Sequence, residues 1–296
     1  MTEQIAPVNG IELCYETFGD PGDEPLLLVM GLGAQMIAWP IELCEGLVDR
    51  GFHVIRYDNR DTGRSTWLDA SAGDFMTAFA AALAGEPVAA PYSLSDMAAD
   101  GMALLDHLGL DQAHVVGASM GGMIAQSMAI EHPHRLRTLT SIMSTTGDPD
   151  VGLPTAEALA ILTQPAPDTR EAAIEQGVAS SQVIASPDHF DEDLARQRST
   201  AAYDRGWHPA GTARHLLAIL SSGSRSEGLA GLSVPTLVIH GDQDPLVTPS
   251  GGQRTAEVVP GAELLVLEGM GHDLPAAYLG PVIDAITAHA ARTANV

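Results

Sequence analysis

The sequence contains no lysine, and its fourteen basic residues are all arginines. Thirty-eight acidic residues stand against them, which gives a formal net charge of −24 at pH 7. Such a chain repels polyanions, so nucleic acid and anionic membrane surfaces are poor candidate partners. Aromatic residues make up only 4% of the chain, which argues against a flat surface for stacking bases or sugars. The composition therefore favours a small-molecule partner.

Cysteine is also scarce, since the chain has only Cys14 and Cys44. Two cysteines at this separation make no disulfide framework and do not have the spacing of metal ligands, so we expect no metal and no other cofactor. No apolar run reaches 18 residues, and the start at Met1-Thr2-Glu3-Gln4 lacks the charged and apolar regions of a secretory signal. We therefore expect a cytoplasmic protein, either a monomer or a homodimer.

Strands and helices alternate in the first half of the chain. Apolar or alternating stretches predict strands at 10–18, 26–32, 53–58, 114–118 and 136–143. Helical spacing and capping residues predict helices at about 40–50, 93–109 and 120–131. The stretch 59–92 reads as irregular, although it contains an apolar run from Phe75 to Leu83. This alternation predicts a mostly parallel sheet covered by helices on both faces.

The alternation stops at about residue 145. From there to about 230 the segments are helical, rich in alanine and acidic, and they are interrupted by six prolines. Strands return at 234–240 and 262–268, and a last helix spans about 276–292. The sequence therefore predicts one α/β core from residues 1–144 and 231–296, with a helical insertion at 145–230.

The motif Gly117-Ala118-Ser119-Met120-Gly121 lies between an apolar strand and a helix. A sharp strand-to-helix turn exposes the side chain of Ser119 and points the N–H of Met120 at the group that the serine attacks. Glycine is needed at 117 and 121 because a Cβ there would clash with the neighbouring strand or helix. With 30 glycines in the chain the pattern is weak alone, so the hypothesis needs partner residues.

His272 is the candidate base among eleven histidines, because the turn Gly269-Met270-Gly271 places it at the carboxyl edge of the sheet. An orienting carboxylate is expected after strand 234–240, where Asp244 is preferred to its competitor Asp242. The order Ser119, Asp244, His272 is the one expected for a nucleophile elbow of this kind.

A second donor for an oxyanion is expected in the loop after the first central strand. That loop reads Met30-Gly31-Leu32-Gly33-Ala34, and the N–H of Leu32 is the candidate donor beside that of Met120. The same glycines also suit an ordinary turn.

These motifs together resemble the α/β-hydrolase superfamily over nearly the whole chain. The resemblance rests on five segments: Met30-Gly31-Leu32-Gly33, 58–65, 117–122, 241–244 and Gly271-His272. Segments 54–65 and 114–117 are similar to the actinobacterial anthracycline (aclacinomycin) methylesterases and related carboxylesterases. The resemblance implies a mostly parallel sheet of the eight-stranded type and a helical cap formed by the insertion. Met30 stands where many relatives have histidine, but the expected donor is a backbone group, so we expect activity to survive this departure.

The expected reaction is hydrolysis of a neutral, hydrophobic small-molecule ester through an acyl-enzyme on Ser119, with His272 activating water. A serine in the elbow argues against epoxide and haloalkane hydrolysis, which use an aspartate. Five enzymatic alternatives stay open on the same triad: lactone or carbon–carbon bond hydrolase, antibiotic methylesterase, aminopeptidase and perhydrolase. A non-enzymatic ligand-binding protein is the alternative of a different class. Candidate lining residues of a substrate pocket are Trp39, Met36, Met123, Trp207 and Leu246.

Overall fold

The computed structural model describes residues 2–71 and 73–292, and its strands form a single eight-stranded sheet. In sheet order the strands are β1 (Gln4–Val8), β2 (Ile11–Phe18), β4 (Phe52–Tyr57), β3 (Glu24–Val29), β5 (Ala113–Ala118), β6 (Leu136–Ile142), β7 (Thr236–Gly241) and β8 (Glu263–Leu267). β2 is antiparallel to β1 and β4, while all pairs from β4 to β8 are parallel. The predicted mostly parallel α/β fold is confirmed.

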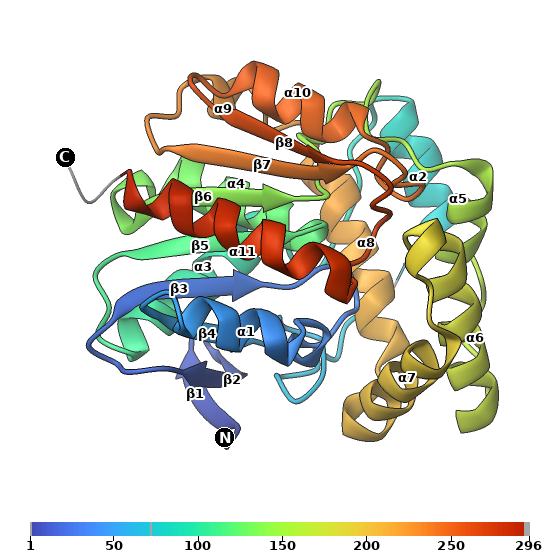
Figure 1. The fold of residues 1–296 in the computed structure, drawn as a ribbon. Helices are drawn as coiled ribbons and strands as arrows, with labels where there is room; N and C mark the ends of the chain where they lie inside the picture. Colours follow the sequence, from blue (N-terminus) through green and yellow to red (C-terminus); the bar gives the residue numbers. More distant parts are fainter. Residues whose placement is uncertain (1, 72, 293–296) are drawn as a thin grey trace.

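Helices connect these strands and cover both faces of the sheet (Figure 1). They are η1 (Met36–Ala38), α1 (Ile41–Val48), α2 (Phe75–Leu83), α3 (Leu94–His107), α4 (Met120–Glu131), η2 (Pro133–Arg135), α5 (Ala156–Leu162), α6 (Arg170–Ile184), η3 (Pro187–His189), α7 (Glu192–Gly206), α8 (Pro209–Ser222), α9 (Ser226–Ala230), α10 (Ser250–Val258) and α11 (Ala276–Ala291). No helix in the described ranges is long and apolar enough to span a membrane.

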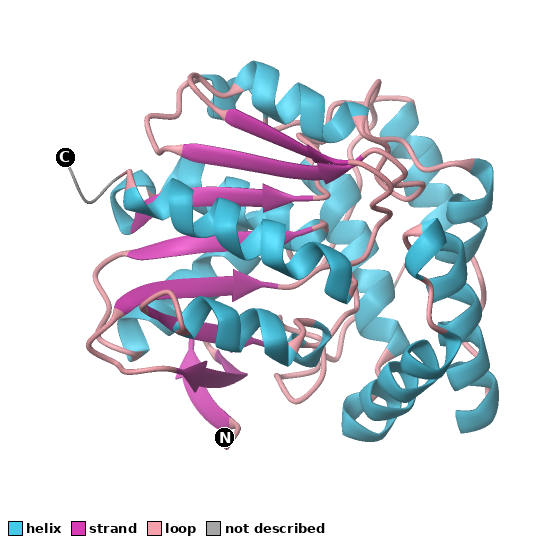
Figure 2. Cartoon of the chain, in the orientation of Figure 1, coloured by secondary structure: helices cyan, strands magenta, loops and turns pink. Residues whose placement is uncertain are grey.

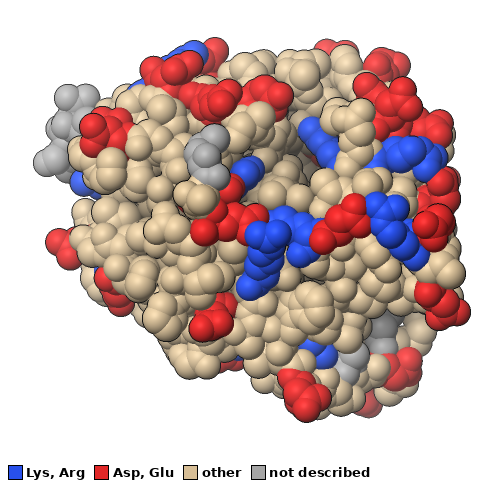
Figure 3. Space-filling view, turned by 90° about the horizontal axis from the view of Figure 1, so that it is seen from below, with Lys and Arg blue, Asp and Glu red and all other residues tan. Residues whose placement is uncertain are grey.

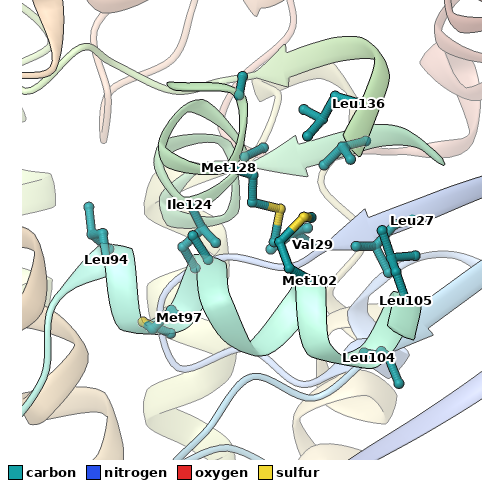
Figure 4. Close-up of a cluster of buried hydrophobic side chains, with 14 of the residues drawn as sticks. Leu27, Val29, Leu94, Met97, Met102, Leu104, Leu105, Ile124, Met128 and Leu136 are labelled. Atoms are coloured by element: carbon teal, nitrogen blue, oxygen red, sulfur yellow. The ribbon is translucent and has the colours of Figure 1, made fainter. Parts of the chain in front are cut away.

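Strand β3 shows how the sheet divides the core into two layers. Side chains on a strand point alternately to opposite faces, so Leu27 and Val29 join one apolar cluster and Leu26 and Leu28 join the other. The first cluster packs under α3 and α4, and Figure 4 shows Leu27 and Val29 together with its side chains from these helices. The second packs under α1 and α11. A strand buried on both faces reads as a continuous apolar run, which explains why it was predictable.

The segment 145–230, which we call the cap, lies beyond the carboxyl ends of the parallel strands. In Figure 1 its helices α5, α6 and α7 stand beyond the arrowheads, and Figure 2 shows the loops that lie between them and the strands. Helices α6 and α7 pack on each other, whereas α9 packs on α4 and α10 of the core. The boundaries between core and cap stay a prediction.

Apart from the short 3-10 helices η1 and η2, which were not predicted, three elements differ from the sequence-based expectation. The apolar run 75–83 was expected to be irregular but forms α2, whose start is capped by Asp74 accepting a hydrogen bond from the Thr77 N–H. β1 was not predicted, because Pro7 and the exposed side chains at 4, 5 and 7 hide its pattern. α10 was not predicted either, because Gly251 and Gly252 in its first turn weaken the helical signal.

Candidate active site

Ser119 occupies a strained turn between β5 and α4. Its backbone has φ +56° and ψ −124°, a conformation that non-glycine residues rarely adopt. A Cβ on Gly117 would lie 2.1 Å from the carbonyl oxygen of Gly121, and a Cβ on Gly121 would lie 2.0 Å from that of Val29. Both glycines are therefore required by close approach to the helix and to β3. The turn lifts the Ser119 side chain to the carboxyl edge of the sheet.

Asp244 and His272 form a buried pair at the same edge. His272 Nδ1 lies 2.7 Å from Asp244 Oδ2, while Asp244 Oδ1 accepts hydrogen bonds from the N–H groups of Leu246 and Val247, both at 2.9 Å. Burial opposes ionisation of Asp244, but His272 and His240 outweigh it and hold its pKa well below the usual value. An ionised Asp244 fixes the His272 ring with Nε2 left for another partner.

Asp242, the competing carboxylate, serves a different turn. Asp242 is exposed, and its Oδ1 accepts a hydrogen bond from the Gly269 N–H at 2.7 Å. Within residues 2–71 and 73–292 it makes no hydrogen bond or ion pair with His272, whereas Asp244 does. The structure therefore pairs Asp244, and not Asp242, with the imidazole.

Ser119 follows the carboxyl end of β5, and His272 follows the carboxyl end of β8, so both lie at the same edge of the parallel sheet. In the part of the chain that the structure describes, the Ser119 hydroxyl makes no hydrogen bond to the His272 ring. Such bonds are often long without substrate and shorten in the Michaelis complex, so this geometry is compatible with a base acting on the hydroxyl.

The loop after β3 lies directly against Ser119. A Cβ on Gly31 would lie 3.0 Å from Ser119 Cβ and 3.5 Å from its Oγ. The loop is a turn in which the Ala34 N–H donates to Gly31 O at 3.3 Å. The N–H groups of Leu32 and Met120 donate no hydrogen bond to any other described residue. Two unused backbone donors near a strained serine are what an oxyanion hole requires.

The five residues predicted to line a pocket have different surroundings. Trp39, Met36 and Met123 are buried, Trp39 in the cluster under α1 and α11 and Met123 in the cluster under α3 and α4. Trp207 is 36% exposed and stacks on a neighbouring tyrosine ring of α7, and Leu246 is half-buried beside Asp244. A pocket role for these residues stays a prediction.

A cavity of about 260 Å³ lies between the cap and the start of α11. Its lining residues include Ile184, Phe190, Leu194, Arg198 and Asp273, and none of the five predicted residues. The cavity adjoins the His272 loop through Asp273.

The cap contributes contacts to the His272 loop that the sequence did not reveal. The His272 N–H donates to Ile184 O at 2.7 Å, and the Gly271 N–H donates to Ser186 Oγ at 2.9 Å. The N–H and hydroxyl of Ser186 both donate to Asp273 Oδ1, at 2.9 and 2.6 Å. Ser186 follows a helix in a segment of ordinary composition, so no sequence pattern marks it.

Cys14 and Cys44 are free and buried, and burial raises their pKa values to about 12 and about 11. The described residues contain no group of three or more His, Cys, Asp or Glu side chains able to hold a metal ion. The role of Ser119 as nucleophile stays a prediction.

The α/β hydrolase fold family matches residues 24–275, and the chain belongs to this family. The rhodomycin D methylesterases DnrP of Streptomyces peucetius and DauP of Streptomyces sp. (strain C5) are 35% and 34% identical to it over 98% of either chain. The 3-oxoadipate enol-lactonase 2 of Acinetobacter baylyi is 28% identical over 87% of this chain and 85% of its own. The predicted resemblance to anthracycline methylesterases is confirmed.

Solved structures support the same fold. The meta-cleavage product hydrolase CumD from Pseudomonas fluorescens matches with a TM-score of 0.78 at 19% identity, over 98% of this chain and 97% of its own. The enol-lactonase from Burkholderia xenovorans matches with a TM-score of 0.72 at 23% identity, over 99% of this chain and all of its own (100%).

Proposed function

We propose that this chain is a serine carboxylic-ester hydrolase that acts on a neutral, hydrophobic small-molecule ester. The observation that carries the proposal is the 2.7 Å contact between Asp244 Oδ2 and His272 Nδ1, at the sheet edge where the strained turn presents Ser119. The similarity to two methylesterases over 98% of the chain supports ester hydrolysis.

In the proposed mechanism His272 Nε2 takes the proton of the Ser119 hydroxyl as Oγ attacks the ester carbonyl carbon. The carbonyl oxygen becomes an oxyanion and accepts hydrogen bonds from the N–H groups of Leu32 and Met120. The tetrahedral intermediate then breaks its bond to the alcohol oxygen, which takes the proton from His272. This leaves an acyl group on Ser119.

Water completes the cycle by the same steps. His272 takes a proton from water, the hydroxide oxygen attacks the acyl carbon, and Ser119 Oγ leaves with the proton returned by His272. General-base assistance of this kind contributes about a hundred- to ten-thousandfold in rate. Each oxyanion donor contributes about a hundred- to a thousandfold. Asp244 stabilises the imidazolium that forms in both halves of the reaction.

The electrostatics of the molecule suit a neutral substrate and an anionic product. Acidic side chains are spread over the face in Figure 3, and the basic side chains there lie beside acidic ones. With a net charge of −24, the field attracts no anion, and it repels the carboxylate that ester hydrolysis releases. Because the two relatives are named rhodomycin D methylesterases, a methyl ester is the group that we expect to be cleaved. We also propose a cytoplasmic location and a monomer or homodimer.

The deciding experiment measures kcat/KM on a panel of p-nitrophenyl esters, methyl esters including rhodomycin D, enol-lactones and meta-cleavage products. We expect esters to be the best substrates and Ser119→Ala to remove the activity. Equal, negligible rates for wild type and Ser119→Ala on every substrate would contradict the proposal and favour a ligand-binding protein. A higher kcat/KM on enol-lactones or on meta-cleavage products would mean that the same triad catalyses lactone or carbon–carbon bond hydrolysis. Aminopeptidase and perhydrolase activity are tested on an amino-acid p-nitroanilide and on hydrogen peroxide with acetate.

A further inference from the structure

Helix α8 of the cap touches the turn that carries the proposed oxyanion donor Leu32. The Gly33 N–H lies 3.2 Å from Nδ1 of His215, and Nε2 of the same ring lies 2.8 Å from the carbonyl oxygen of Arg60. Thr212, one turn earlier on α8, fills the space beside Gly33, because a Cβ there would lie 2.5 Å from Thr212 Oγ1. Two side chains on one face of α8, Thr212 and His215, therefore contact the same glycine of the loop, Gly33.

The two partners of His215 determine its protonation state. A backbone N–H only donates and a carbonyl only accepts, so Nδ1 must be the acceptor and Nε2 must carry the hydrogen. The side chain is 0% exposed, and burial lowers the pKa of His215 to about 4. The ring is therefore neutral at pH 7, in one fixed tautomer, with both nitrogen atoms in use.

The hydrogen bond from Gly33 to His215 affects the direction in which the Leu32 N–H points. The turn from Gly31 to Ala34 has a positive φ of +62° at Gly33 and a negative φ at Leu32, which is the pattern of a type II turn. Type I and type II turns differ by a flip of the peptide between the two central residues, here Leu32 and Gly33. Holding the Gly33 N–H fixes that peptide and keeps the turn closed. The Leu32 N–H belongs to the preceding peptide, whose carbonyl oxygen, Gly31 O, accepts from the Ala34 N–H, so a closed turn also fixes the direction of the Leu32 N–H.

We propose that His215 is a positioning residue that keeps the turn at Gly31–Ala34 closed and thereby keeps the Leu32 N–H aimed at the oxyanion. The effect of His215 on the reaction rate rests on the proposed ester hydrolysis. The structural half of the inference, the hydrogen bond from Gly33 to His215, does not depend on that function. The cap thus takes part in transition-state stabilisation as well as covering the site.

Replacing His215 by leucine removes both hydrogen bonds and leaves the Gly33 N–H and Arg60 O without a partner. The Leu32 donor stays in the chain but loses its fixed direction, so we expect a smaller loss than deletion of a donor. That deletion costs about a hundred- to a thousandfold, and we expect kcat to fall about thirtyfold here, with KM nearly unchanged. Glutamine offers one acceptor and one donor at similar reach, so His215→Gln should stay within about threefold of wild type.

The matched control is His289→Leu. His289 is also a buried histidine whose Nε2 donates to a backbone carbonyl, that of Pro235 at 3.1 Å, but it lies at the amino end of β7, away from Ser119. Its replacement should lower the unfolding temperature and leave kcat unchanged. A loss of kcat in His289→Leu as large as in His215→Leu would show that any buried histidine has this effect, and would overturn the proposal.

The test measures kcat and KM with a p-nitrophenyl ester, and the Ki of a trifluoromethyl ketone, which forms an oxyanion on the serine. Titration with a fluorophosphonate counts the folded active sites. We expect His215→Leu to raise Ki by the same factor by which it lowers kcat, at full titration, and His215→Gln to restore both. An unchanged Ki, or a glutamine variant as impaired as the leucine variant, would overturn the proposal.

Wild-type protein alone decides the structural half, whether or not it hydrolyses esters and whether or not the variants fold. A scalar coupling between the Gly33 amide nitrogen and His215 Nδ1, measured by NMR on isotope-labelled protein, is expected. Absence of the coupling, or a hydrogen on Nδ1, would overturn the inference. If the coupling is present and no ester is hydrolysed by wild type, it is the proposed function that fails.

Discussion

Strands β4, β5 and β7 bury every side chain, whereas helices α6 and α7 of the cap bury only Ile174, Val178 and Ala195. In the cap, α6 and α7 are joined by exposed ion pairs, Arg170 with Asp204 and Arg196 with Glu175. Apolar burial thus holds the core, and charged side chains on the surface link the cap helices. The core can therefore hold the atoms of the site rigidly, whereas the position of the cap depends on its contacts with the core.

The attachments between cap and core are unlike the ion pairs within the cap, because they are buried. Arg205 of α7 reaches the carboxylate of Asp58 at 2.7 Å, with side chains 7% and 0% exposed. His215 and Ser186 reach the loops of Leu32 and His272. The cap is therefore fixed to the core at Asp58 and at the loops of Leu32 and His272, and four variants test this contrast.

The largest effect is expected inside the core, for Asp244→Asn. An amide in place of the carboxylate no longer stabilises the imidazolium of His272, and the equivalent change in a serine protease costs about 10⁴-fold in kcat. We expect a loss of that order in kcat/KM on a p-nitrophenyl ester. The control is Asp242→Asn, because Asp242 contacts the Gly269 N–H in the turn before His272 and not the imidazole itself. The amide oxygen of asparagine can still accept from Gly269, so we expect a change below about threefold. The opposite ranking would mean that Asp242 is the acid of the triad.

The sequence predicted the core well because its physical signals are local. A fully apolar strand such as β3 and a strand–glycine–helix pattern around Ser119 are readable without coordinates. The cap attachments were not readable, because Ser186 and His215 have no neighbouring pattern and find their partners, Gly271 and Gly33, far along the chain. The choice between Asp242 and Asp244 was only a preference, since both follow the same strand.

Gly121→Ala tests the rigidity of the core. The new methyl group would lie 2.0 Å from the carbonyl oxygen of Val29, a backbone atom of β3 that has no room to move. We expect a loss of about 3 kcal/mol in the free energy of unfolding, measured by urea denaturation. Gly280→Ala in α11 is the control, because no described atom outside its chain neighbours and its own helix lies within 4 Å of the new methyl group. The following Pro281 limits the helical gain from alanine, so we expect a change below about 1 kcal/mol. Equal stabilities of the two variants would contradict the close approach.

Arg205→Leu tests the buried attachment between cap and core. Burial already raises the pKa of Asp58, and Arg205 opposes that shift, so its removal leaves a carboxyl group with no cation in a buried site. Breaking a buried pair in this way costs about 3 kcal/mol in stability, and we expect that loss in urea denaturation.

Arg196→Leu is the comparison for Arg205→Leu. It removes an ion pair with Glu175 in which the two side chains are 39% and 63% exposed, and the denaturation midpoint should not move measurably. If both variants unfold at the same urea concentration, the distinction between the attachment and the surface pairs is wrong.

Ser186→Ala should have the smallest effect, because only one hydroxyl is lost. That hydroxyl accepts from the Gly271 N–H and donates to Asp273, so its removal loosens the loop just before His272. We expect kcat to fall about fivefold, with a loss of about 1 kcal/mol in stability, as for one buried hydrogen bond. Ser181→Ala is the matched control, since the Ser181 hydroxyl donates to Gly177 O within α6 and makes no hydrogen bond to the described residues of the His272 loop. A fall in kcat shared by both variants would assign the effect to the helix, whereas a fall confined to Ser186→Ala assigns it to the attachment of the His272 loop.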